Sequence, residues 1–155
     1  MAYYVGIDPG KKGAFEVIDE YGALITVEKK VTAHDLTQLM RTFRPRHVFV
    51  EKAQAMPKQG VASTFSYGQG FGELLGVLTA TNIAFTLIRP TSWTKLMHQG
   101  TAGAETKKRS AEAFGRLFPA AVEKTRLKSG RLHDGIVDAA LIAIYGLRHV
   151  LVGQA

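Results

Sequence analysis

The sequence contains no cysteine among its 155 residues, and this absence removes several kinds of site from consideration. Disulfide bonds, thiolate metal centres and cysteine nucleophiles all require a thiol. A chain without cysteine also fits a reducing compartment, so we expect a cytoplasmic protein.

Long apolar runs are missing too. No stretch approaches the roughly 20 apolar residues that a membrane-spanning helix needs, and no basic segment at the start leads into an apolar one, so we expect neither a membrane segment nor a signal peptide. Internal repeats and low-complexity segments are also absent. Because 46% of the residues are hydrophobic, we predict a single domain over residues 1–155 with a substantial core.

The chain carries a net charge of +7, and this excess of positive charge is concentrated in one segment. Between Arg89 and His133 there are ten Lys or Arg residues and three acidic ones, and the rest of the chain is balanced. A local positive field suits a polyanion such as nucleic acid. The alternative is a solvated basic face that only aids solubility.

Hydrophobic periodicity predicts an α/β fold with a five-stranded mixed sheet flanked by helices. Three strands would form an antiparallel meander and two would be parallel, with Thr32 capping the first helix and Pro45 ending it. The predicted strands span residues 2–8, 13–19, 23–30, 46–51 and 83–88. The predicted helices span residues 34–43, 63–82, 105–118 and 133–151.

Two carboxylates stand at strand ends. Asp8 ends the first predicted strand, where Pro9 keeps the chain extended, and Glu51 ends the apolar strand at 46–51. Each has an ordinary alternative, because Asp-Pro-Gly also starts turns and a lone glutamate often forms a salt bridge at a sheet's rim. If these two strands are neighbours, the two carboxylates lie side by side.

Two more carboxylates open the last helix. Asp134 and Asp138 are four residues apart, so their Cβ atoms should lie about 5–6 Å from each other on one helix face. Acids are favoured in a first helical turn, and Asp134 could be the N-cap. Asp138, however, starts a buried apolar run. Carboxylates collected without matching cations indicate a divalent metal such as Mg²⁺, and hence metal-assisted phosphodiester chemistry.

Several motifs in order resemble the RuvC family of Holliday-junction resolvases, in particular its short phage-type members, and the resemblance covers nearly the whole chain. These motifs are Gly6-Ile7-Asp8-Pro9-Gly10, Val50-Glu51-Lys52, the block from Pro57 to Phe71, Pro90-Thr91-Ser92-Trp93, Lys107-Lys108-Arg109 and the run from His133 to Leu141.

The resemblance implies a ribonuclease H-like fold and a homodimeric endonuclease of DNA recombination and repair. Such an enzyme nicks two opposed strands of a four-way DNA junction in the cytosol of a bacterium or of a phage-infected host. It implies Mg²⁺, with Mn²⁺ as a substitute and two ions in each site, held by Asp8, Glu51, Asp134 and Asp138. Family members often space their last two metal-site residues three apart, which leaves open whether Asp134 or His133 completes the site.

The charge and position of several residues predict contacts with DNA. Lys107 is the candidate for stabilising the transition state, although a phosphate-positioning or solvent-facing role is an equal alternative. An apolar side chain of the loop from Met56 to Phe65, or Tyr67, could open the junction as a wedge, or it could pack in the core. The predicted DNA-binding residues are Lys52, Met56, Lys58, Phe65, Tyr67, Lys107, Lys108, Arg109, Lys128 and Arg131.

Paired cuts need a dimer, and we place its close contacts on Gly68, Gly72 and Gly76. Trp93 is interpreted as a packing anchor in preference to a base-stacking platform. Two other functions stay open: a broader nuclease of the same fold that acts on branched DNA or RNA–DNA hybrids, and a non-catalytic DNA-binding module.

Overall fold

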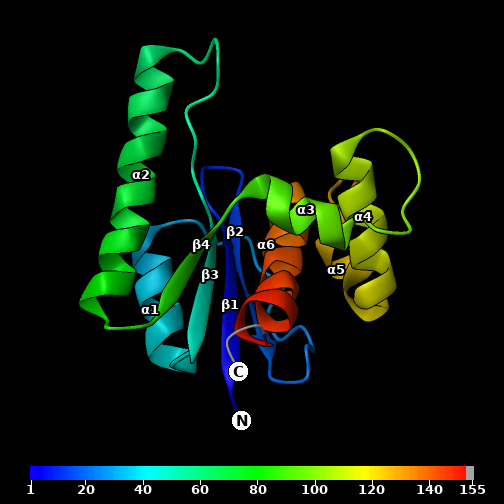
Figure 1. Cartoon of the computed structure of the whole chain (residues 1–155), viewed down its shortest axis with the longest axis horizontal. Helices are drawn as coiled ribbons and strands as arrows, with labels where there is room; N and C mark the ends of the chain where they lie inside the picture. Colours follow the sequence, from blue (N-terminus) through cyan, green and yellow to red (C-terminus); the bar gives the residue numbers. More distant parts are fainter. Residues whose placement is uncertain (153–155) are drawn as a thin grey trace.

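The computed structural model describes residues 1–152, which form one four-stranded sheet with helices on both faces (Figure 1). The strand order is β2–β1–β3–β4. β1 is antiparallel to β2 and parallel to β3, and β4 is parallel to β3. The strands are β1 (Tyr3–Asp8), β2 (Ala14–Asp19), β3 (His47–Glu51) and β4 (Phe85–Ile88).

The helices divide into two layers. α1 (Ala33–Phe43) and α2 (Val61–Ala80) cover one face, and α6 (Asp134–Tyr145) with its continuation (Gly146–Leu151) covers the other. α3 (Pro90–Met97), α4 (Thr106–Leu117), a 3₁₀ turn (Pro119–Ala121) and α5 (Val122–Thr125) complete the second layer. Figure 1 shows the first half of α2 extending beyond the end of the sheet.

Both ends of α1 lie where the sequence predicted them. Thr32 caps the helix, because its hydroxyl accepts a hydrogen bond from Asp35 N–H and its own N–H donates to the Asp35 carboxylate. The helix ends at Arg44, which adopts a left-handed conformation directly before Pro45.

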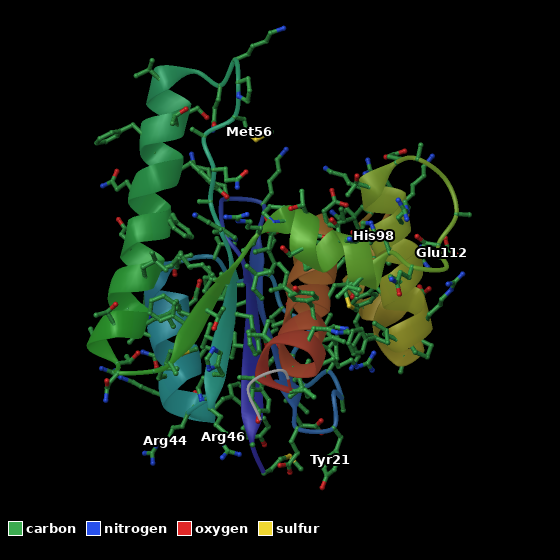
Figure 2. The ribbon with its side chains drawn as sticks, viewed as in Figure 1. Tyr21, Arg44, Arg46, Met56, His98 and Glu112 are labelled. Carbon is green, nitrogen blue, oxygen red and sulfur yellow. The ribbon has the colours of Figure 1, made fainter. Side chains whose placement is uncertain are left out.

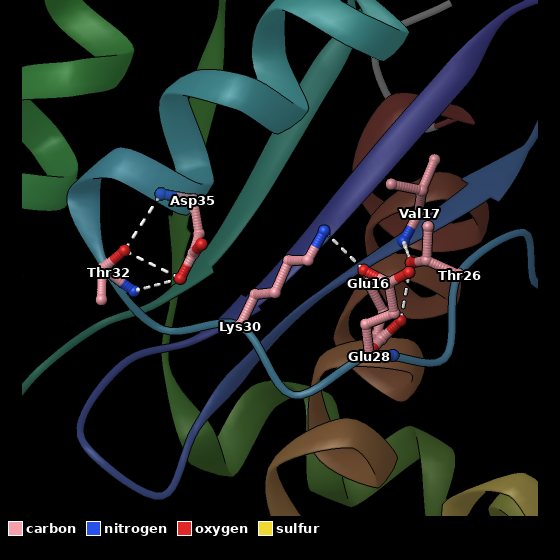
Figure 3. Close-up of polar contacts among 7 residues, drawn as sticks. All are labelled: Glu16, Val17, Thr26, Glu28, Lys30, Thr32 and Asp35. Carbon is pink, nitrogen blue, oxygen red and sulfur yellow. Dashed lines mark hydrogen bonds and ion pairs between the residues drawn. The ribbon is translucent and has the colours of Figure 1, made fainter.

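The predicted third strand of the meander, residues 23–30, is wrong: this segment has one isolated bridge to β2 and no ladder. Buried Glu16 on β2 explains the difference, since its carboxylate accepts hydrogen bonds from the Thr26 hydroxyl (2.6 Å) and Glu28 N–H (3.1 Å). Val17 N–H donates to the Thr26 hydroxyl instead of to a carbonyl oxygen (Figure 3). Backbone hydrogen bonds join the two segments only near Leu24, and side chains replace the ladder beyond it.

Three glycines let α6 lie unusually close to the sheet. A Cβ atom on Gly6 of β1 would lie 1.9 Å from the carbonyl oxygen of Ala139. A Cβ on Gly135 would meet the backbone of residues 12 and 13, and one on Gly146 would meet the ring of Phe49. Close packing of α6 on β1 brings its first turns to the end of β1, where Asp8 lies.

Candidate acidic centre and basic groove

Sheet register places Asp8 beside Glu51. β1 and β3 are parallel neighbours with Ile7 opposite Val50, so the residues that follow these two end their strands side by side. Both side chains are half-buried at this edge of the sheet. The first strand and the strand that ends at Glu51 are therefore neighbours, as the sequence analysis supposed.

α6 adds the remaining two carboxylates. Its N-cap is His133, whose Nδ1 accepts a hydrogen bond from Ile136 N–H (3.2 Å), so the alternative in which Asp134 is the cap does not hold. Asp134 lies in the first turn and Asp138 one turn later, both half-buried. Since the His133 ring is buried and occupied by capping, Asp134 is the better placed of the two to face the acidic centre.

The pKa shifts of these carboxylates indicate that the four side chains lie near one another. Burial raises the pKa of Asp8 well above its ordinary value, and the charges of Asp138, Glu51 and Asp134 raise it further. Burial and the charge of Glu51 raise the pKa of Asp138 to about 7. Burial also raises the pKa of Glu51. We call these four residues the acidic centre.

The donor chemistry of the acidic centre fits a hard divalent cation, because carboxylate oxygens that repel one another are the ligands that Mg²⁺ and Mn²⁺ prefer. Within residues 1–152, however, no three His, Asp or Glu side chains are arranged as a ready metal-binding group. A bound cation would have to draw these carboxylates inward.

Lys107 occupies part of the acidic centre. Its ammonium group forms an ion pair with Asp134 (2.8 Å), and Arg131 lies 4.0 Å from the same carboxylate. Asp134 in turn raises the pKa of Lys107. Both partners are substantially exposed, so this ion pair is weak and can exchange for other charged groups.

Neither protein-family models nor curated proteins give a match to the sequence. Among solved structures, RuvC of Thermus thermophilus is similar at a TM-score of 0.72 and 20% sequence identity, over 99% of this chain and 98% of that one. The chain has the RuvC fold.

A second similar structure is T. thermophilus RuvC in complex with a Holliday junction substrate. Its TM-score is 0.66 and its sequence identity is 18%, over 99% of this chain and 96% of that chain. The RuvC fold is an α/β fold of the ribonuclease H-like type, so the predicted fold class is confirmed apart from the strand count. No helix in the described part of the chain is long and apolar enough to cross a membrane.

Two cavities adjoin the acidic centre of this RuvC-like fold. The smaller, of about 210 Å³, lies between the loop after β3 and α2, and the larger, of about 410 Å³, lies between α4 and the start of α6. The smaller is lined by residues that include Glu51, Lys52, Met56 and Tyr67. The larger, which we call the basic groove, is lined by residues that include Lys107, Lys108, Arg131 and Asp134.

Other predicted DNA-binding residues are dispersed. Lys52, Lys58 and Lys128 are exposed outside the basic groove. Arg109 instead turns inward, where its guanidinium donates hydrogen bonds to the Thr101 hydroxyl (3.0 Å) and the His98 carbonyl (3.2 Å). These partners give Arg109 a structural role, and its contact with DNA stays a prediction.

The three apolar wedge candidates differ in exposure. Met56 and Phe65 are 65% and 74% exposed, and Figure 2 shows Met56 on the loop beyond the end of the sheet. Tyr67 instead packs its ring against Gly10 and lies close enough to Asp8 and Glu51 that burial and these charges raise its pKa to about 12. The core alternative therefore does not apply to Met56 and Phe65.

The glycines of α2 are uncovered in this chain. A Cβ atom on Gly68, Gly72 or Gly76 would meet nothing within 4 Å. These three positions are therefore open to a partner, and the dimer itself stays a prediction.

Sequence reasoning missed three polar residues near the acidic centre. Trp93 is a buried packing anchor, as interpreted, but its indole N–H also donates to Glu51 Oε2 (2.6 Å). His98 and Ser110 form a buried hydrogen bond (2.8 Å). Ser110 follows Lys107 at helical spacing, which could have suggested a shared face, whereas no sequence signal marks His98.

Proposed function

We propose that this protein is a metal-dependent endonuclease that resolves four-way DNA junctions by paired nicks. The observation that carries the proposal is the convergence of Asp8, Glu51, Asp134 and Asp138 at one end of a RuvC fold. The basic groove beside them supports a phosphate-rich substrate. The junction bound to T. thermophilus RuvC supports branched DNA as that substrate.

The four carboxylates, Asp8, Glu51, Asp134 and Asp138, would hold two Mg²⁺ ions. When bound, the ions would supply the positive charge that activates water for attack on the phosphodiester and stabilises the leaving 3′ oxygen. Lys107, which is paired with Asp134, would exchange that partner for a DNA phosphate and stabilise negative charge there.

DNA would be recognised by shape. Lys107, Lys108 and Arg131 would contact phosphates, which positions a duplex arm without reading its bases. Exposed Met56 and Phe65 lie on the segment that extends beyond the sheet, and an apolar side chain there could enter the opened crossover. Two copies joined through α2 would place two acidic centres on opposed strands.

The test is incubation of the purified protein with a labelled immobile four-way junction in Mg²⁺ or Mn²⁺. Linear duplex, flap and RNA–DNA hybrid substrates run in parallel. We expect paired nicks in the junction and much slower cleavage of the other substrates. Equal cleavage of all four would indicate a broader nuclease. Salt-sensitive binding without any product would indicate a DNA-binding module.

Asp8→Asn is the matched control for this assay. The amide keeps the size of the side chain and removes the charge that would hold metal, so cleavage should be lost while junction binding survives. Full activity of Asp8→Asn would remove Asp8 from the mechanism.

A further inference from the structure

A buried polar pair lies inside the apolar layer between α3, α4 and α6. His98 and Ser110 are 3% and 2% exposed, and His98 Nε2 lies 2.8 Å from Ser110 Oγ. Figure 2 shows His98 between α3 and α4. Burying two polar side chains is costly unless every donor and acceptor is used. The groups that contact His98 and Ser110 therefore indicate the role of these two residues.

The third member of this arrangement is Asp138. The Ser110 side chain lies near enough to the Asp138 carboxylate to lower its pKa, partly opposing the effect of burial. A hydroxyl has one proton, so if Ser110 turns that proton to Asp138 its oxygen must accept from His98 Nε2–H. Burial and Arg109 lower the pKa of His98, which favours the neutral ring.

A second neutral donor serves Glu51. The indole N–H of Trp93 donates to Glu51 Oε2 at 2.6 Å and opposes the effect of burial on the pKa of Glu51. The indole ring meets the His98 ring edge to face, with centroids 5.7 Å apart. Glu51 therefore takes a hydrogen bond from this packed layer, and Asp138 lies beside the Ser110 hydroxyl of the same layer.

Helix spacing fits this arrangement. Lys107 and Ser110 are three residues apart on α4, and their partners Asp134 and Asp138 are four apart on α6. Residues at these spacings lie on one face of a helix. One face of α4 therefore presents a charged hydrogen-bond donor, Lys107, and a neutral one, Ser110, to the acidic centre.

We propose that Trp93, His98 and Ser110 are positioning residues that hold the carboxylates of Glu51 and Asp138 in orientation for a divalent cation. This inference rests on the proposed function. Neutral donors orient a carboxylate without adding a positive charge that would compete with the cation. Removing such partners of metal ligands elsewhere costs roughly 10- to 100-fold in metal affinity or activity.

Three variants remove one donor each: Ser110→Ala, His98→Phe and Trp93→Phe. Thr125→Val is the control, because it deletes a hydroxyl that is equally buried and bonds only to the carbonyl oxygen of Ala121. Thermal denaturation identifies variants that fold. Mg²⁺ affinity is then measured by calorimetry without DNA.

Trp93 provides a second readout because it is the only tryptophan in the chain. Its indole N–H gives a single resonance in an ¹H–¹⁵N spectrum, and this resonance should move on addition of Mg²⁺. In Glu51→Gln the movement should be lost.

We expect each variant that folds to bind Mg²⁺ about 10- to 100-fold more weakly than the wild type, with Thr125→Val unchanged. Wild-type affinity in Ser110→Ala and Trp93→Phe would overturn the proposal. So would an indole resonance that stays in place while calorimetry records binding. Wild-type protein that binds Mg²⁺ without cleaving junctions would count against the proposed function alone.

Discussion

At the scale of single residues, carboxylates with raised pKa values dominate the chemistry of this protein, and they occur in two different settings. Burial and neighbouring acids raise the pKa values of Asp8 and Asp138, which also favours the binding of cations. Glu16 lies away from the acidic centre and is satisfied by Thr26 and Glu28 instead. Burial raises the pKa of Glu16 to about 8. This residue therefore makes folding depend on pH.

Glu16→Gln tests this dependence. The ordinary glutamate pKa of 4.5 applies to the unfolded chain and about 8 to the folded one, so the folded state binds more protons and loses stability as pH rises from 4.5 to 8. Glutamine has no such loss. Urea unfolding at pH 5 and pH 9 should show the wild type losing about 3–5 kcal/mol more than Glu16→Gln. Parallel losses in both proteins would contradict the assignment.

Single residues were predictable where the local pattern was unusual. Asp138 stood out because a charge at the head of an apolar helix is expensive, and the structure does place it against other acids. The inward turn of Arg109 and the bond between Trp93 and Glu51 were not predictable. Both depend on contacts between segments that no local spacing encodes.

At the scale of elements, the position of α6 decides whether the acidic centre exists. Gly6 allows the backbone of α6 to touch β1, and Gly135 allows its first turn to touch the turn after Asp8. Helix positions were well predicted by periodicity. The strand at 23–30 was not, because buried Glu16 and the hydroxyl of Thr26 replaced the expected ladder.

Gly6→Ala and Gly70→Ala form a matched pair for this packing. A methyl at Gly6 would meet a backbone atom that cannot move alone, so we expect a loss of about 1–3 kcal/mol or more in unfolding free energy. A methyl at Gly70 in α2 meets nothing within 4 Å and should add up to about 1 kcal/mol through helix propensity. Chemical denaturation measures both, and equal effects would refute the close approach of α6.

At the scale of the whole molecule, the pairing of β1 with β3 and the packing of α6 across them were predictable, since carboxylates at strand ends suggested which strands should be neighbours. The assembly was harder to predict, because an open helix face in one chain does not specify its partner. In the proposed dimer, a second copy would cover Gly68, Gly72 and Gly76 of α2.

Gly72→Trp tests the dimer. A bulky side chain on the open face should keep two copies apart and leave a folded monomer, whereas Gln38→Trp at an exposed position of α1 should leave the assembly unchanged. Sedimentation measures the mass of each. A wild-type monomer, or a dimer that survives Gly72→Trp, would remove this face from the assembly.

The central claim is that four carboxylates from β1, β3 and α6 close on divalent metal. A crystal soaked in Mn²⁺ and measured for anomalous scattering tests it most directly. We predict Mn²⁺ peaks about 3.5–4 Å apart, bound by Asp8, Glu51, Asp134 and Asp138. Carboxylates that stay apart, with no anomalous peak between them at saturating Mn²⁺, would contradict the account.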